Sequence, residues 1–224
     1  MTRTKLFLSA VVKYLMGILL FGAMLFLPAG TLHYFGGWLL MGALLIPMLL
    51  MGIVMFIKSP DLLQKRLDPR EKQSAQKSVI GLSALMFLAV FVLAGLDFRF
   101  GWSQLPKWVN LSAAALLLIA YALYAEVLRE NAYLSRTIEV QEGQKVVSTG
   151  LYGIVRHPMY AVTLLLFAMM PLTLGSLPAL AVMAVYPALI VVRIVNEEKL
   201  LTAELDGYAD YKKKVKYRLI PFIW

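Results

Sequence analysis

Residues 149–160 read "TGLYGIVRHPMY" and place an arginine, a histidine and a proline directly before an apolar run. Pro158 suits the first turn of a helix, where its missing N–H costs no hydrogen bond. We therefore expect a helix to begin at Pro158, with His157 capping it or pointing into its mouth. The free N–H groups of such a first turn can receive an anion such as a carboxylate. Taken alone, Arg156 and His157 are more simply interpreted as interface residues that flank a membrane helix.

The rest of the chain is strongly apolar. Of its 224 residues 60% are hydrophobic and 16% are charged, and the mean hydropathy is +0.73. Several stretches reach the roughly 18–20 apolar residues that cross a bilayer. The sequence thus predicts an all-α polytopic integral membrane protein with about six membrane helices, near 6–27, 35–57, 78–97, 108–129, 158–175 and 178–200. The last two should form a hairpin around "PLTLGSLP", and the fifth is short for a full crossing.

Composition also excludes several function classes. The chain has no cysteine and only two histidines, which excludes disulfides and thiolate sites and argues against a metal centre. A net charge of +9 could indicate nucleic-acid binding. In a membrane protein it has a simpler explanation, which is the surplus of Lys and Arg in cytoplasmic segments. We expect membrane lipids, and neither metal nor nucleic acid, among the partners.

The positions of the basic residues predict the topology. Eighteen Lys and Arg residues lie before the first helix or in segments 58–77, 129–156 and 199–224, and only Arg99 and Lys107 lie in the opposite loops. The rule that cytoplasmic loops are basic puts both termini in the cytoplasm, at the plasma (inner) membrane if the source is bacterial. The basic, partly helical loop 58–77 should attract anionic lipid headgroups, and the C-terminal tail should lie on the membrane surface.

A second polar segment, "RIVNEEKLL" at residues 193–201, ends the last helix. Arg193 and Glu197 are four residues apart and share one helix face, so an intrahelical ion pair is the simpler interpretation. Ionisable residues near membrane depth, however, usually line a cavity or a site. The hairpin should bring this segment beside "RHP", and we therefore predict a polar pocket at the cytoplasmic mouth of the helix pair.

Three segments carry a family resemblance: "STGLYGIVRHPMY", "RIVNEEKLL" and "YADYKKKVKYRLIP". In order and spacing they resemble the signature of the isoprenylcysteine carboxyl methyltransferase family and its phospholipid-methyltransferase relatives. The resemblance covers about residues 137–224 and divides the chain into N-terminal membrane helices (1–130) and a signature region (131–224). It implies a membrane methyltransferase that uses S-adenosyl-L-methionine. The cofactor would lie in a cytoplasmic pocket closed by the 130–157 loop and the tail.

The resemblance also assigns residues. It implies that Arg193 is the catalytic residue that faces the methyl acceptor. The residues that it implies for cofactor binding are Gln144, Lys145, Val146, Val147, Tyr152, His157, Pro158, Met159, Tyr160, Glu197 and Glu198. Val162 departs from the family pattern, which usually has glycine there, so the substrate tunnel could differ in width.

The expected reaction is carboxyl O-methylation of a lipophilic, isoprenylcysteine-like acceptor, either a small molecule or a lipid-anchored one. A carboxylate is already ionised at neutral pH and needs a cationic partner rather than a base, and arginine can grip it with two hydrogen bonds. The alternatives are a phospholipid or amine N-methyltransferase of the same fold, an NADPH-dependent enzyme resembling sterol reductases, and a membrane protein without catalytic activity.

Overall fold

The computed structural model describes residues 2–67, 74–134 and 140–224, and this part of the chain consists of helices and turns without a strand. Parts of the predicted loops 58–77 and 130–157 lie outside the described residues. The helices are α1 Arg3–Ala29, α2 Phe35–Lys58, α3 Pro60–Leu67, α4 Ser74–Phe100, α5 Lys107–Glu130, the 3-10 turn η1 Gly150–Gly153, α6 Pro158–Leu174, α7 Leu177–Met183, α8 Tyr186–Glu204 and α9 Tyr208–Lys214.

Five helical stretches in this part are long and apolar enough to cross a membrane. They are Arg3–Ala29, Phe35–Lys58, Val79–Phe100, Lys107–Glu130 and Leu177–Glu204. Helix α6 is also apolar but shorter, as expected for the fifth predicted helix. The prediction of an all-α polytopic membrane protein is confirmed.

The last predicted helix differs in one respect from the expectation of a single element over 178–200. It is divided into α7 and α8, with Ala184 and Val185 between them. Pro187 lies in the first turn of α8, where it has no N–H to donate and its ring would clash with the carbonyl of Met183. The proline therefore interrupts the helix without ending the crossing.

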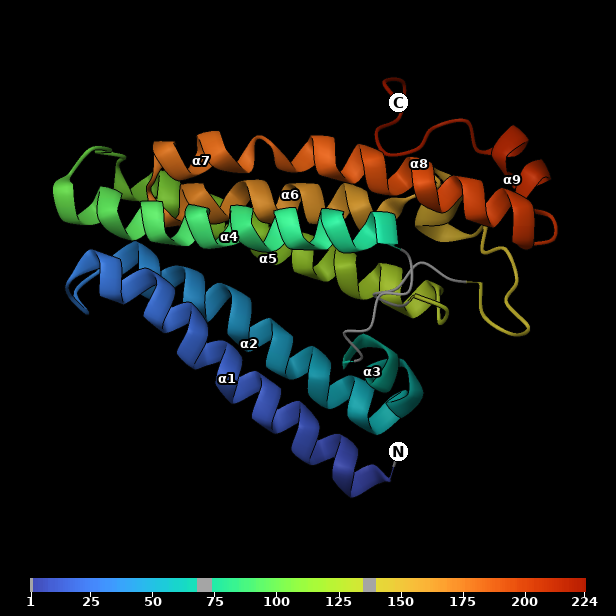
Figure 1. The fold of residues 1–224 in the computed structure, drawn as a ribbon, viewed down its shortest axis with the longest axis horizontal. Helices are drawn as coiled ribbons and strands as arrows, with labels where there is room; N and C mark the ends of the chain where they lie inside the picture. Colours follow the sequence, from blue (N-terminus) through green and yellow to red (C-terminus); the bar gives the residue numbers. More distant parts are fainter. Residues whose placement is uncertain (1, 68–73, 135–139) are drawn as a thin grey trace.

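Figure 1 shows how the helices are arranged. Helices α4, α5, α6 and the α7–α8 pair run alongside one another, and α1 and α2 form a second pair set at an angle to them. The turns that join α1 to α2, α4 to α5 and α6 to α7 lie at one end. Both termini, α3 and α9 lie at the other end. That this side is the cytoplasmic one stays a prediction from the charges.

Buried polar side chains fix the end opposite the termini. Tyr34 Oη donates to the carbonyl of Leu174 at 2.8 Å, and Asn110 Nδ2 donates to the carbonyl of Thr173 at 3.0 Å. Asp97, in the last turn of α4, accepts from the backbone N–H of Ser103 at 2.6 Å and from its hydroxyl at 2.8 Å. These bonds satisfy groups at the C-terminal ends of α4 and α6, which would otherwise lack partners. They hold the hairpin that carries the site against its neighbours.

Candidate active site

The turn before α6 is tied to the C-terminal tail through its backbone. The N–H of Arg156 donates to the carbonyl of Tyr217, and the N–H of His157 donates to that of Arg218, both at 2.9 Å. Helix α6 begins at Pro158, as the sequence predicts, and His157 occupies its N-cap without a capping hydrogen bond from its side chain. Segments about 60 residues apart in the chain therefore meet at the start of α6.

Glu198 holds this junction together through its carboxylate. It accepts from Arg156 Nε at 2.7 Å and from Arg218 Nε at 2.9 Å, and His157 Nε2 lies 3.3 Å from its Oε1. Arg156 also donates through Nη1 to the carbonyls of Val215 and Lys216, at 2.7 and 2.8 Å. A buried carboxylate is tolerated only when it is paired in this way. Glu198 is 4% exposed, and its role here is to fasten the tail to α8.

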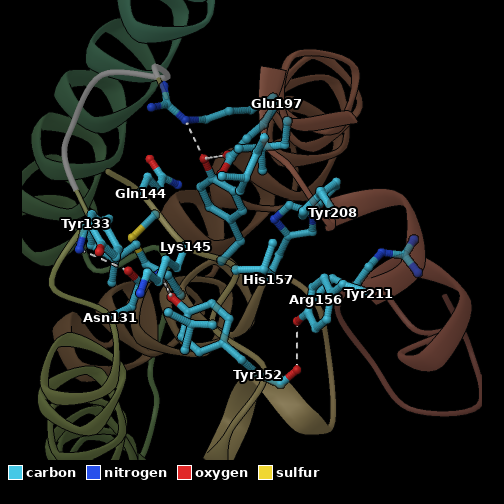
Figure 2. A pocket seen from close by; sticks show the side chains of 18 residues that line it. Asn131, Tyr133, Gln144, Lys145, Tyr152, Arg156, His157, Glu197, Tyr208 and Tyr211 are labelled. Carbon is cyan, nitrogen blue, oxygen red and sulfur yellow. Dashed lines mark hydrogen bonds between the residues drawn. The ribbon is translucent and has the colours of Figure 1, made fainter. Parts of the chain in front are cut away.

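Beside this junction lies a cavity of about 100 Å³. In Figure 2, His157 stands between one wall that includes Asn131, Gln144 and Lys145 and another that includes Tyr208 and Tyr211. The full lining is Asn131, Tyr133, Leu134, Gln144, Lys145, Val146, Val147, Tyr152, Arg156, His157, Met159, Tyr160, Arg193, Glu197, Leu201, Leu205, Tyr208 and Tyr211.

Most of the residues singled out from the sequence meet in this cavity, and a few do not. Those that line it are Gln144, Lys145, Val146, Val147, Tyr152, His157, Met159, Tyr160, Arg193 and Glu197. Within the part of the chain that the structure describes, Pro158 and Glu198 do not line the cavity. Val162 is also outside the lining and is buried in the helix core, so its bulk does not narrow the cavity directly.

Tyr160 links the two opposite charges of the cavity. Its hydroxyl donates to Glu197 Oε2 at 2.5 Å and accepts from Arg193 Nε at 2.9 Å. The Arg193 guanidinium carbon also lies 6.0 Å from the centre of the Tyr160 ring, at the edge of the cation–π range. An anion and a cation thus stand in one cavity, fixed relative to each other by a tyrosine on the neighbouring helix.

Two further tyrosines, Tyr152 and Tyr211, form another part of the cavity wall. Tyr152 Oη accepts from Asn131 Nδ2 at 3.1 Å, and the carbonyl of Tyr152 accepts from Tyr211 Oη at 2.7 Å. Burial raises the pKa of Tyr211 to about 12 and raises that of Tyr152 further. Both phenols are therefore neutral at physiological pH and act as hydrogen-bonding groups rather than charges.

Glu130 supports the turn below the cavity. Its Oε2 accepts from the N–H of Leu151 at 3.1 Å. Gly150, with a φ of +51°, leaves the space that this carboxylate fills, because a Cβ there would clash with Glu130 Oε1. Glu126 and Arg129, at the same helix end, pair with each other at 2.5 Å. The sequence left open whether Glu126, Arg129 and Glu130 pair with one another or reach the pocket. In the structure Glu126 pairs with Arg129, and Glu130 instead binds the backbone of the turn.

Sequence reasoning missed eight of the lining residues: Asn131, Tyr133, Leu134, Arg156, Leu201, Leu205, Tyr208 and Tyr211. Arg156 was interpreted only as part of the "RHP" flank. Tyr208 and Tyr211 could have been found from the sequence, because the spacing in "YADY" puts both rings on one face of a short helix. Asn131 had none, since a polar residue just after a membrane helix is ordinary.

Residues 110–203 match the model of the isoprenylcysteine carboxyl methyltransferase (ICMT) family. The match confirms the family resemblance. It begins in α5, before the motifs from which the resemblance was inferred, and it ends before α9 and the tail. With its long apolar helices, the chain is an integral-membrane protein carrying a region of a methyltransferase family. No curated protein matches the chain.

Proposed function

We propose that this protein transfers a methyl group from S-adenosyl-L-methionine to the carboxylate of a lipophilic, isoprenylcysteine-like acceptor at the membrane. The observation that carries the proposal is the pairing of Arg193 and Glu197 through Tyr160 in one cavity, within the region that matches the ICMT family. The cavity thus offers the Arg193 cation to the carboxylate of the acceptor and, beside it, the Glu197 anion to the ammonium group of the cofactor.

The polar groups of the cavity fit the cofactor. S-adenosyl-L-methionine carries an ammonium group, and Glu197 offers a carboxylate for it. Other parts of the cavity wall come from residues 144–147, Tyr152, His157, Met159 and Tyr160. The cavity of about 100 Å³ is smaller than the roughly 300–1,000 Å³ of typical ligand pockets, so its walls must separate to admit the cofactor. When bound, the cofactor supplies an electrophilic methyl group.

Arg193 suits the acceptor. A guanidinium binds a carboxylate through two parallel hydrogen bonds and so fixes the orientation of the attacking oxygen. Arg193 and Glu197 are one helix turn apart, so an acceptor bound to the first and a cofactor bound to the second would lie next to each other. In-line methyl transfer to an ionised oxygen needs alignment and exclusion of water rather than a base.

The outer surface of α8 favours a lipophilic acceptor. Val191, Val192 and Val195 lie on other faces of α8 than Arg193, and they are 39%, 49% and 36% exposed. Apolar side chains that are exposed on a membrane helix face the lipid, because the surrounding hydrocarbon is itself apolar. An acceptor with a hydrocarbon chain would therefore reach Arg193 sideways from the bilayer, while a soluble cofactor enters from the aqueous side.

The test is the chemical nature of the methylated product. The purified protein is incubated with methyl-labelled S-adenosyl-L-methionine and a membrane lipid extract. The proposal predicts label in the lipid phase that mild alkali releases as volatile methanol, because methyl esters hydrolyse. Alkali-stable label would indicate N-methylation of an amine or headgroup instead. Absence of labelled lipid, together with oxidation of NADPH by the same preparation, would favour a reductase.

A further inference from the structure

Five tyrosines line the cavity, and four of their hydroxyl groups have a partner. Tyr133 donates to the carbonyl of Gly143 at 3.1 Å, and Tyr152, Tyr160 and Tyr211 make the bonds described above. The fifth, Tyr208, differs from them. Its hydroxyl is buried and has no hydrogen-bond partner, and among the described residues it is the one buried side-chain polar atom in that condition.

Such an atom needs an explanation. Nearly all buried polar groups in native proteins are hydrogen-bonded, because leaving one unpaired forfeits its bonds to water without replacing them. Tyr208 is only 4% exposed and its side chain forms part of the cavity wall, as Figure 2 shows. A buried hydroxyl without a partner, in the wall of a cavity proposed to bind a ligand, is available for a hydrogen bond to that ligand.

The surroundings of Tyr208 hold it in place. Helix α9 begins directly after Gly207, whose φ of +80° gives the sharp change of direction at that point. The Tyr208 ring packs against Tyr211 with 5.7 Å between the ring centres, and Tyr211 is itself bonded to the carbonyl of Tyr152. The ring therefore cannot move far to find another partner within the protein.

The same surroundings keep the hydroxyl protonated. Burial raises the pKa of Tyr208, and the nearby carboxylates of Glu198 and Glu197 raise it further. At physiological pH the group is a neutral O–H donor in the neighbourhood of Glu197. Arg156, another hydrogen-bond donor in the cavity wall, already donates to Glu198 and to two backbone carbonyls of the tail.

We propose that Tyr208 Oη donates a hydrogen bond to the carboxylate at the amino-acid end of S-adenosyl-L-methionine. This inference rests on the proposed function, in which Glu197 takes the ammonium group of the same amino-acid end. Ammonium and carboxylate are attached to one carbon, so the group that binds the second must lie close to the group that binds the first. The hydroxyl of Tyr208 is a donor without a partner and lies near Glu197, as a group that binds the cofactor carboxylate must.

The test compares two ligands on the variant Tyr208→Phe, which keeps the ring and removes only the hydroxyl. Titration calorimetry measures the affinity for S-adenosyl-L-methionine and for its decarboxylated form. We expect the variant to bind the complete cofactor roughly tenfold or more weakly, as for a lost hydrogen bond to a charged group. It should bind the decarboxylated form as the wild type does. Tyr217→Phe, the same change outside the cavity, should alter neither affinity.

The unliganded protein gives a second readout. Because Tyr208→Phe removes an unpaired polar atom, its melting temperature should equal or exceed that of the wild type. An equal loss of affinity for both ligands, or a lower melting temperature, would make Tyr208 a packing residue and overturn the inference. Unchanged affinity for the complete cofactor would do the same and leave the proposed function standing. A wild type that binds neither ligand would overturn both.

Discussion

Tyr160 lies between Arg193 and Glu197, and a single hydroxyl sets the position of both charges. Sequence reasoning placed these residues in one pocket, because their spacing and the hairpin bring them together. It could not separate the roles of Glu197 and Glu198. Adjacent residues on a helix point in directions about 100° apart, so only one of the pair can face the cavity, and this depends on how α8 is rotated against α6 and the tail.

Replacing Arg193 by lysine tests its assignment to the acceptor. The variant Arg193→Lys keeps the positive charge and loses the planar fork that orients a carboxylate. We expect cofactor affinity to be retained and turnover to fall on the order of a hundredfold, since small misplacements of reacting atoms have effects of that size. Affinity and turnover are measured on one preparation. Turnover close to that of the wild type would remove Arg193 from the catalytic role.

At the scale of elements, the tail is held to the hairpin by Glu198. The variant Glu198→Gln leaves the buried Arg156 and the half-buried Arg218 without their counter-charge. Breaking a buried pair from one side costs about 3–5 kcal/mol, so we expect a clear drop in melting temperature and faster proteolysis after α8. Glu204→Gln, an exposed change on the same helix, is the control. A variant as stable and as protease-resistant as this control would contradict the role given to Glu198.

The turn η1 depends on Gly150, which makes room for Glu130. Gly150→Ala imposes the strain of a side chain at positive φ and also displaces the Glu130 carboxylate. Gly143→Ala imposes a similar strain at a φ of +69° with nothing within 4 Å of the added Cβ. We expect thermal unfolding to show roughly 1–2 kcal/mol of loss for Gly143→Ala and a larger loss for Gly150→Ala. Equal losses would mean that Glu130 does not support the turn.

Helix positions were predictable from the sequence because long apolar runs leave few alternatives in a membrane. The division between α7 and α8 was missed, since Pro187 lies within an apolar run that reads as continuous. The tail was recognised as basic and aromatic, and the family resemblance implied that it closes the pocket, but the contacts that dock it were not predictable. That docking depends on backbone bonds between residues 156–157 and 217–218, and no local pattern indicates such pairing.

At the scale of the whole molecule, both termini lie at one end of the helices, and the candidate site lies at that end too. The distribution of Lys and Arg predicts that this end is cytoplasmic. The absence of cysteine makes the test simple. In intact cells a membrane-impermeant maleimide should label Gln104→Cys, and it should label Lys213→Cys only after permeabilisation. The reverse pattern would place the cavity on the wrong side for a cytoplasmic cofactor.

The central claim is that the cavity is a site for S-adenosyl-L-methionine, and the most direct measurement is a calorimetric titration of the wild type and of Glu197→Gln. We predict one saturable site for S-adenosyl-L-methionine and none for NADPH. Glu197→Gln should weaken the binding roughly tenfold or more, because it removes the charge that faces the ammonium group. Binding of NADPH alone, or unchanged affinity in a folded Glu197→Gln variant, would contradict the account.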